Sequence, residues 1–384
     1  MKPAQRCNAI TPFIVMEIME KIHQMEARGI DVIHMEIGEP DCNVPECVNQ
    51  VSMEAFSQNE THYTHSLGDI RLRQAIRDYH LKTYGTRVDT DHILVTNGTS
   101  PAMLLLFSAL INPGDEVIIS DPHYACYANF INYVQGVPVT VPVHEEEGFV
   151  YTPEAIQEKI TARTKAIFIN SPSNPTGNVI PEERMRQIVE IAEANGLYVI
   201  SDEIYHGLVY EGKEHSILEF TKQAFVLNGF SKLFAMTGLR LGYLISPPEY
   251  IRALQVLQQN FFICANSIAQ LAGAAALKDS ARETSEMRER YNRRRLYMVE
   301  RLQGMGFDIK VVPTGAFYVF VNARHISNDS YALALDILEK AHVGVTPGID
   351  FGANGEGFIR FSYANAMAHL ETGLDRMEAY VNGL

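Results

Sequence analysis

A lysine in an apolar stretch is the first residue that could do chemistry. Lys232 lies in the run NGFSKLFAMTGLRLG (228–242), close to Phe230 and Leu233. Burial lowers the pKa of an ammonium group, and the free amine is a nucleophile toward an aldehyde. Arg240, eight positions later, is a permanent cation that suits a phosphate. A surface lysine whose stem packs on apolar neighbours would also explain the run.

Two further charged residues accompany strand-like apolar runs. Asp202 follows such a run in SDEIYH (201–206), and Arg360 interrupts another in FIRFSYA (358–364). A buried carboxylate requires a cation or a hydrogen-bond donor, and the planar fork of an arginine suits a carboxylate in two-point contact. A helix N-cap or a carboxylate pair with Glu203 would also explain the aspartate, and a structural salt bridge the arginine.

Three polar turns contain the remaining candidates. In TNGTSPA, Gly98 permits close backbone approach, and Thr99 and Ser100 open a helix whose free N–H groups favour a phosphate. Tyr124 in DPHYACY presents a flat face to a ring, and Asn174 in the firm turn NSPSNPTGN offers a donor and an acceptor. Taken alone, the three turns are more typical of a helix N-cap, a packed aromatic and an ordinary polar loop, respectively.

The elements that position these residues alternate between short β-branched runs and helical stretches. The expected strands are 92–96, 116–120, 137–143, 166–170, 197–201, 224–228 and 240–245. Helical patterns such as 100–111 and 181–196 lie between them. Near-continuous apolar strands separated by helices predict an α/β fold with a mostly parallel sheet covered on both faces. Ligand sites then lie beyond the carboxyl ends of the strands.

The pattern changes after residue 249 and becomes α+β in character. Helices are expected over 249–278, 281–305, 330–341 and 366–381, and strands over 317–322 and 358–364. We therefore expect a large domain over 46–284 and a smaller α+β domain built from both chain ends, 1–45 and 285–384.

Composition excludes several classes of function. The 384 residues carry a net charge of −14, which would repel nucleic acid and anionic membranes. The five cysteines are odd in number and show no CxxC spacing, so neither a disulfide framework nor a zinc knuckle is indicated. The sequence contains no signal-peptide pattern and no membrane-span pattern, which favours the cytoplasm.

An ordered set of motifs resembles the class I and II aminotransferases of the aspartate aminotransferase fold type, pyridoxal-phosphate fold type I. The motifs are IGEPD (37–41), HYTHSLGDIRLRQAI (62–76), NPTG (174–177), SDEIY (201–205), SK…GLRLG (231–242), PTGAFY (313–318) and FIRFSYA (358–364). The set covers more than 300 residues in the family's order. The resemblance implies pyridoxal 5′-phosphate as cofactor and transfer of an amino group from an L-amino acid to a 2-oxo acid.

The resemblance also implies roles for individual residues. Lys232 matches the catalytic lysine that binds the cofactor aldehyde as an imine and moves the substrate proton. Asp202 matches the carboxylate that keeps the pyridine nitrogen protonated, and Arg360 the clamp on the substrate α-carboxylate. Tyr205 and Asn174 match groups that bond the ring's phenolic oxygen, and Asn174 also lies beside the substrate in the family. Tyr124 matches the aromatic residue on the ring face, and Gly38 matches the segment that closes over the substrate. The residues that match the phosphate site are Gly98, Thr99, Ser100, Ser231 and Arg240.

Some family features extend beyond one active site. Tyr63 matches a tyrosine that reaches the phosphate in the other subunit, which implies a homodimer. The family often has cis bonds at positions like Pro122 and Pro175. Two positions depart from the family: Gly229 lies where many relatives have a phosphate-binding serine, and Cys42 replaces an aromatic residue.

The absence of a lysine from the phosphate loop bears on the substrate. Some relatives place a lysine at the position of Ser100, where it would serve a second carboxylate. Ile37, Phe261 and Phe262 are expected to form apolar pocket walls. These residues favour a neutral or hydrophobic amino donor, with 2-oxoglutarate or pyruvate as acceptor.

Three alternatives remain open at this point. The same cofactor serves lyases, such as a C–S β-lyase or a relative of 1-aminocyclopropane-carboxylate synthase. The fold also serves as a non-catalytic effector-binding domain in regulators, which carry an N-terminal DNA-binding domain that this chain is not expected to have. A metal-dependent hydrolase using Asp202, Glu203 and His206 is not favoured, because no HExxH-like spacing occurs and no metal is expected.

Overall fold

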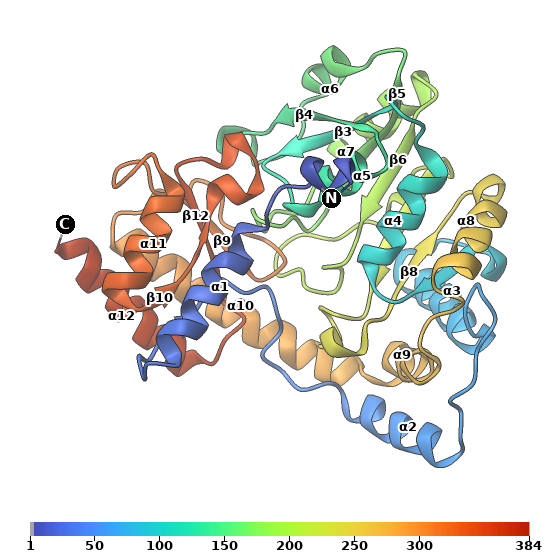
Figure 1. Ribbon diagram of the computed structural model, residues 1–384, viewed down its shortest axis with the longest axis horizontal. Helices are drawn as coiled ribbons and strands as arrows, with labels where there is room; N and C mark the ends of the chain where they lie inside the picture. The colour runs from blue at the N-terminus through green and yellow to red at the C-terminus, as the bar shows by residue number, and fades with distance from the viewer. Residues whose placement is uncertain (1–3, 384) are drawn as a thin grey trace.

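The computed structural model describes residues 4–383, and its architecture has two parts (Figure 1). One part is a seven-stranded sheet with helices on both faces, and the other is built on a three-stranded sheet. The α/β fold class predicted from the sequence is therefore confirmed.

The seven-stranded sheet has the order β2-β8-β7-β6-β5-β3-β4. Its strands are β2 (Ile93–Thr96), β3 (Glu116–Asp121), β4 (Val137–Pro142), β5 (Thr164–Asn170), β6 (Tyr198–Asp202), β7 (Ala224–Gly229) and β8 (Gly242–Ile245). Strand β8 pairs antiparallel with both of its neighbours, and the other pairs are parallel. The carboxyl ends of the parallel strands therefore meet at one edge.

Consecutive residues of these strands belong to two different cores because side chains alternate between the faces of a sheet. In β5, Ile167 and Ile169 lie in one core and Phe168 in the other. One face is covered by α4 (Thr99–Leu110), α5 (Cys126–Tyr133) and α8 (Pro248–Phe261). The other is covered by α3 (Ile70–Tyr84), α6 (Pro153–Lys159), α7 (Glu182–Ala194) and α9 (Ser267–Asp279), with α2 (Glu46–Ser57) packed on α9.

The three-stranded antiparallel sheet joins segments from the C-terminal part of the chain. It has the order β11-β12-β9, formed by Thr346–Pro347, Phe358–Ser362 and Tyr318–Asn322. Three helices accompany it: α10 (Ala281–Gly304), α11 (Ser330–Ala341) and α12 (Met367–Asn382). Between residues 4 and 383, short 3-10 helices occur at Gln5–Ala9, Thr90–His92, Glu145–Glu147, Ile217–Glu219, Thr237–Leu239, Gly348–Phe351 and Ala353–Gly355.

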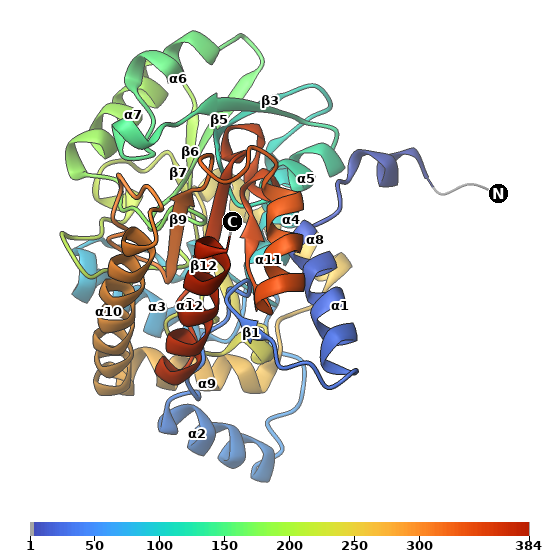
Figure 2. The same ribbon diagram turned by 90° about the vertical axis from the view of Figure 1, so that its left-hand side faces the viewer.

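The N-terminal segment packs against this C-terminal part. Strand β1 (Ile33–His34) pairs in parallel with β10 (Val343–Gly344). Helix α1 (Ile14–Glu26) contacts β10 and β11. Figure 2 views this part of the molecule from the side that carries α1, β1, α11 and α12. Segments more than 300 positions apart are thereby joined. The domain limits at 45/46 and 284/285 stay a prediction.

One predicted helix is wrong. The stretch 249–278 is two helices, because α8 ends at Phe261 and α9 begins at Ser267. Between them Ile263 has a φ of +66°, a left-handed conformation that cannot continue a helix. The side chain of Asn266 then accepts a backbone hydrogen bond as the N-cap of α9. Apolar periodicity runs through the break, so the pattern alone did not show it.

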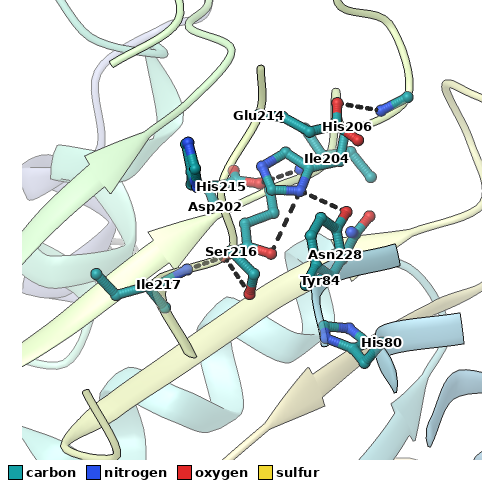
Figure 3. Close-up of polar contacts among 12 residues, drawn as sticks. His80, Tyr84, Asp202, Ile204, His206, Glu214, His215, Ser216, Ile217 and Asn228 are labelled. Carbon is teal, nitrogen blue, oxygen red and sulfur yellow. Dashed lines mark hydrogen bonds and ion pairs between the residues drawn. The ribbon is translucent and has the colours of Figure 1, made fainter. Parts of the chain in front are cut away.

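A buried polar cluster lies behind the end of β6 (Figure 3). Glu203 is 0% exposed, and its Oε1 accepts hydrogen bonds from Ser216 Oγ at 3.1 Å and the Ile217 amide at 2.9 Å. Its Oε2 lies 3.5 Å from His206 Nδ1, which also meets the Tyr84 hydroxyl at 2.8 Å. No lysine or arginine of residues 4–383 pairs with this carboxyl.

Burial without a cationic partner raises the pKa of Glu203 to about 8, while burial lowers the pKa of His206 to about 3. Both side chains are therefore neutral at pH 7. The cluster anchors the segment after Asp202 to α3 and to the 216–217 turn without adding a charge.

Glu203→Gln tests the neutral state of this acid. The folded protein retains a proton that the unfolded chain releases above its ordinary pKa of 4.5, so wild-type stability falls as pH rises from about 4.5 to about 8. Glutamine carries no such proton. We expect the variant to gain stability over wild type by on the order of a few kcal/mol between pH 5 and pH 8.5, measured by denaturant unfolding. An equal stability difference at both pH values would contradict the neutral acid.

Candidate active site

A cavity of about 390 Å³ lies at the strand edge, between the seven-stranded sheet and the smaller part. Most of the residues predicted from the sequence line it: Gly38, Thr99, Ser100, Tyr124, Asn174, Asp202, Tyr205, Ser231, Lys232, Arg240 and Arg360. They come from loops and strand ends far apart in the sequence. Their meeting in one cavity is what the parallel topology requires.

Lys232 follows β7 and points its amine into this cavity. Its Nζ donates a hydrogen bond to the Gly38 carbonyl at 2.6 Å. The rings of Tyr205 and Phe317 each lie with their centroids 5.9 Å from Nζ. Desolvation is the main cause that lowers the pKa of Lys232 to about 8, with the nearby Glu39 carboxylate opposing it. The structure thus provides a lysine whose free amine is accessible near neutral pH.

Asp202 is the last residue of β6 and is 4% exposed. Its Oδ2 accepts a hydrogen bond from the Tyr127 hydroxyl at 2.7 Å, and its Oδ1 accepts one from the Ile204 amide at 3.1 Å. Burial raises the pKa of Asp202 to about 6, while these two donors and the Lys232 cation lower it. The carboxyl is therefore mostly ionised at pH 7, in a dry place where its charge acts strongly.

The first turn of α4 and Arg240 lie together and present donors that could hold an anion. Gly98, the N-cap, has a φ of +101°, and a Cβ there would lie 2.7 Å from the Arg240 Nη2 atom. Thr99 and Ser100 follow with the free amides of the helix N-terminus. Arg240 has a φ of +51° and is held by a 2.9 Å hydrogen bond from Nη1 to the Thr237 carbonyl. Gly98 does not line the cavity but makes room for the arginine behind it.

Strand β8 starts at Gly242 and not at the predicted residue 240. The left-handed conformation of Arg240 is the reason, since it cannot belong to an extended strand. The bend directs the guanidinium toward α4. Gly242 also allows this approach, because a Cβ there would lie 2.9 Å from the Thr99 amide nitrogen.

Arg360 lies in β12 and is 4% exposed. Its Nη1 donates to Asn174 Oδ1 at 2.8 Å, and its Nη2 donates to the Glu36 carbonyl at 2.5 Å and to Thr346 Oγ1 at 3.1 Å. All these acceptors are neutral, and Nε has no hydrogen-bond partner within residues 4–383. No described carboxylate forms an ion pair with Arg360, so the structure does not support the salt-bridge interpretation, and the nearby Asp350 carboxyl interacts with the guanidinium only at longer range.

The turns that carry Tyr124 and Asn174 contain cis peptide bonds, at Asp121–Pro122 and Asn174–Pro175. Both were expected from the family resemblance and are confirmed. A third, Ser171–Pro172, was not expected.

The sequence missed part of the cavity wall. Four side chains from the start of α1 line it, namely Phe13, Val15, Met16 and Met19, together with Met103, Tyr127 and Tyr318. Ile37 lines the cavity as predicted, but Phe261 and Phe262 do not. Phe261 is the last residue of α8 and is 58% exposed. In the sequence, Met16 and Met19 lie one helical turn apart, and this spacing was the available signal for an apolar wall.

Three other positions lie outside this cavity. Tyr63 is 80% exposed, so its role in a neighbouring subunit stays a prediction. Cys42 does not line the cavity, and a Cβ at Gly229 would lie 3.0 Å from the Leu241 carbonyl, which leaves little space for a serine. Within residues 4–383 no three His, Cys, Asp or Glu side chains are grouped to hold a metal ion. The Glu203 and His206 side chains belong to the separate cluster of Figure 3.

No helix in the described part of the chain combines the length and the apolar character needed to cross a membrane.

Comparison with known proteins adds independent evidence. The family model for aminotransferase class I and II matches residues 30–376. A Methanocaldococcus jannaschii protein named (5-formylfuran-3-yl)methyl phosphate transaminase is 41% identical over 96% of this chain and 97% of its own. The aspartate aminotransferase of Pyrococcus horikoshii is 37% identical over 99% of this chain and 97% of its own. A Thermus thermophilus aspartate aminotransferase double mutant superposes with a TM-score of 0.95 and 36% identity, covering 99% of both chains.

All three relatives match in sequence over almost the whole chain, and the Thermus thermophilus protein also matches in three-dimensional structure. Their names agree with the class of chemistry that the motifs indicated. The chain belongs to the class I and II aminotransferase family and is a transaminase of fold type I.

Proposed function

We propose that this aminotransferase binds pyridoxal 5′-phosphate through Lys232 and accepts a neutral or apolar L-amino acid as donor, with a 2-oxo acid such as 2-oxoglutarate or pyruvate as acceptor. The observation that supports it most is the meeting of a desolvated amine, a buried carboxylate and a set of donors suited to an anion in one cavity. When bound, the cofactor supplies a conjugated ring that takes up the electron pair of the broken substrate Cα–H bond.

The residues present fit this cofactor. The space that Gly98 leaves beside Arg240, with the amides and hydroxyls of Thr99 and Ser100, suits a phosphate. Ser231 lines the same cavity. The ionised carboxylate of Asp202 would hold a proton at the pyridine nitrogen, while Asn174, Tyr205 and Tyr124 would contact the phenolic oxygen and the ring face.

The Lys232 amine would move the substrate Cα proton. A pKa of about 8 leaves about a tenth of the amines unprotonated at pH 7, so the group can both accept and return a proton. Arg360 would bind the substrate α-carboxylate, for which its lack of an acidic partner makes it available. The apolar wall from α1 would exclude water.

Lys232→Ala tests the covalent anchor. Without the amine the purified protein should not develop the visible absorbance of the lysine-bound cofactor, and transamination should stop. Absorption spectroscopy after incubation with the cofactor measures the first effect. Lys222→Ala, which changes an exposed lysine ten positions away, is the control that should keep the band. A variant at position 232 with a wild-type spectrum would refute the assignment.

Asp202→Ala tests the carboxylate. Loss of one partner from a buried ion pair costs about 3–5 kcal/mol, which corresponds to roughly a 10²–10⁴-fold lower turnover. Steady-state kinetics measure this loss, and circular dichroism shows whether the fold remains. Near-normal turnover in a folded variant would refute the role.

The charges in the cavity support the substrate class. Within the described residues the cations that line it are Lys232, Arg240 and Arg360, and the proposal assigns all three. None remains for a second acidic group, so these charges favour pyruvate over 2-oxoglutarate as acceptor unless a further cation comes from elsewhere, and the α1 side chains offer apolar contact to the donor. The Methanocaldococcus relative is named for a substrate that carries a phosphate, and such a group would require a further cation, for example from the partner in the proposed homodimer. The cytoplasmic location likewise stays a prediction.

Ser100→Lys tests the specificity argument. A cation at this position should pair with a second carboxylate and raise the ratio of kcat/KM for aspartate over leucine by roughly tenfold or more. Parallel kinetics with both donors measure the ratio. The control is Gln303→Lys, which adds the same charge on the exposed surface of α10. A wild-type enzyme that turns over aspartate and leucine equally well would count against the apolar donor.

A further inference from the structure

One buried tyrosine contacts several of the residues assigned above. Tyr318 is the first residue of β9 and is 1% exposed, yet it lines the cavity. Its hydroxyl lies 2.8 Å from the hydroxyl of Tyr205, which follows β6 in the seven-stranded part. This hydrogen bond joins the two parts of the molecule at the site.

The ring of Tyr318 supports the guanidinium of Arg360. The Arg360 Cζ atom lies 4.3 Å from the centroid of Tyr318 and 4.9 Å from that of Phe351. A cation over an aromatic face is attracted by the ring electrons, and the attraction is strongest where water is excluded. The two rings therefore fix the position of the guanidinium without neutralising its charge.

The same hydroxyl also determines the approach of the N-terminal segment. A Cβ on Gly38 would lie 2.1 Å from the Tyr318 oxygen, so no larger residue fits there. The Gly38 carbonyl in turn accepts the hydrogen bond from the Lys232 amine. A simple packing role for Tyr318 would explain the buried ring, but it would not explain a hydroxyl placed between Gly38 and Tyr205.

We propose that Tyr318 is a positioning residue with two roles: its ring holds Arg360 for carboxylate binding, and its hydroxyl donates to Tyr205. This inference rests on the proposed function. If the Tyr205 O–H donates to the cofactor's phenolic oxygen, its oxygen must accept in the bond with Tyr318, so Tyr318 is the donor. Burial raises the pKa of both phenols, and the Arg360 cation opposes the rise at both. The pKa of Tyr205 is raised further than that of Tyr318, and the more acidic of two hydroxyls is the better donor, which favours Tyr318 as the donor.

Two variants separate the hydroxyl from the ring. Tyr318→Phe keeps the ring beside Arg360 and removes the donor to Tyr205. Tyr318→Leu removes the ring as well. The control is Tyr151→Phe, which deletes a hydroxyl that is equally buried, donates to the Phe168 carbonyl at 2.8 Å and lies outside the cavity. The measurements are the pH midpoint of the cofactor's visible absorbance, steady-state kinetics, and calorimetric binding of 3-phenylpropanoate as a carboxylate probe.

For Tyr318→Phe we expect kcat to fall about tenfold, as for the loss of one buried hydrogen bond, while KM and probe affinity stay within about twofold of wild type. The absorbance midpoint should rise by about half a pH unit or more, because Tyr205 becomes a weaker donor. For Tyr318→Leu, probe affinity should also fall about tenfold, because Arg360 loses its aromatic support.

An unchanged midpoint and kcat in Tyr318→Phe would overturn the inference. So would a pattern in which both variants lose only thermal stability, as Tyr151→Phe is expected to do, since that is the mark of a purely structural residue. A wild-type protein that shows no visible band with the cofactor would instead overturn the proposed function, so the two failures are distinguishable.

Discussion

The withdrawal of one amine and one carboxyl from water is the constraint on which the site depends. Burial lowers the pKa of Lys232 to about 8 and raises that of Asp202 to about 6, so the surroundings disfavour the charged form of each group. The Glu39 carboxylate limits the shift at Lys232, and hydrogen bonds from the Tyr127 hydroxyl and the Ile204 amide limit the shift at Asp202. The Gly38 carbonyl accepts a hydrogen bond from the amine. An amine with its pKa near 8 can react with an aldehyde at neutral pH, and a carboxyl with its pKa near 6 is still mostly ionised at pH 7.

That constraint is met only when both parts of the molecule pack together. Asp202 and Lys232 belong to the seven-stranded part, whereas Gly38 comes from the N-terminal segment and Arg360 from the three-stranded sheet. The segment that contains Gly38 is held at both sides, by the pairing of β1 with β10 and by the bidentate ion pair from Arg294 to Asp41. The cavity is therefore a product of long-range packing, and folding of the parallel sheet alone would leave the amine in water.

The sequence predicted what depends on local pattern. Strand runs and the turns after them were visible because β-branched residues and polar turn residues follow one another, and parallel topology brings such turns to one edge. Tyr127 and Tyr318 were not predicted, since helix and strand periodicity shows that a side chain is buried but not which atom it meets. The break between α8 and α9 was missed for a related reason: an asparagine cap within a periodic apolar stretch differs little from an ordinary helical position.

Two buried arginines show why burial alone does not identify a binding residue. Arg294 is 6% exposed, and both of its terminal nitrogens meet the Asp41 carboxylate at 2.8 Å, so its charge is compensated within the protein. Arg360 is as deeply buried, but its partners within residues 4–383 are an amide oxygen, a carbonyl, a hydroxyl and two aromatic faces. Such neutral groups orient a guanidinium and leave its net charge in place. An incoming carboxylate can then pair directly with a cation in a dry cavity and does not have to break an internal ion pair. The partner set of an arginine therefore decides whether it holds the fold together or binds a substrate.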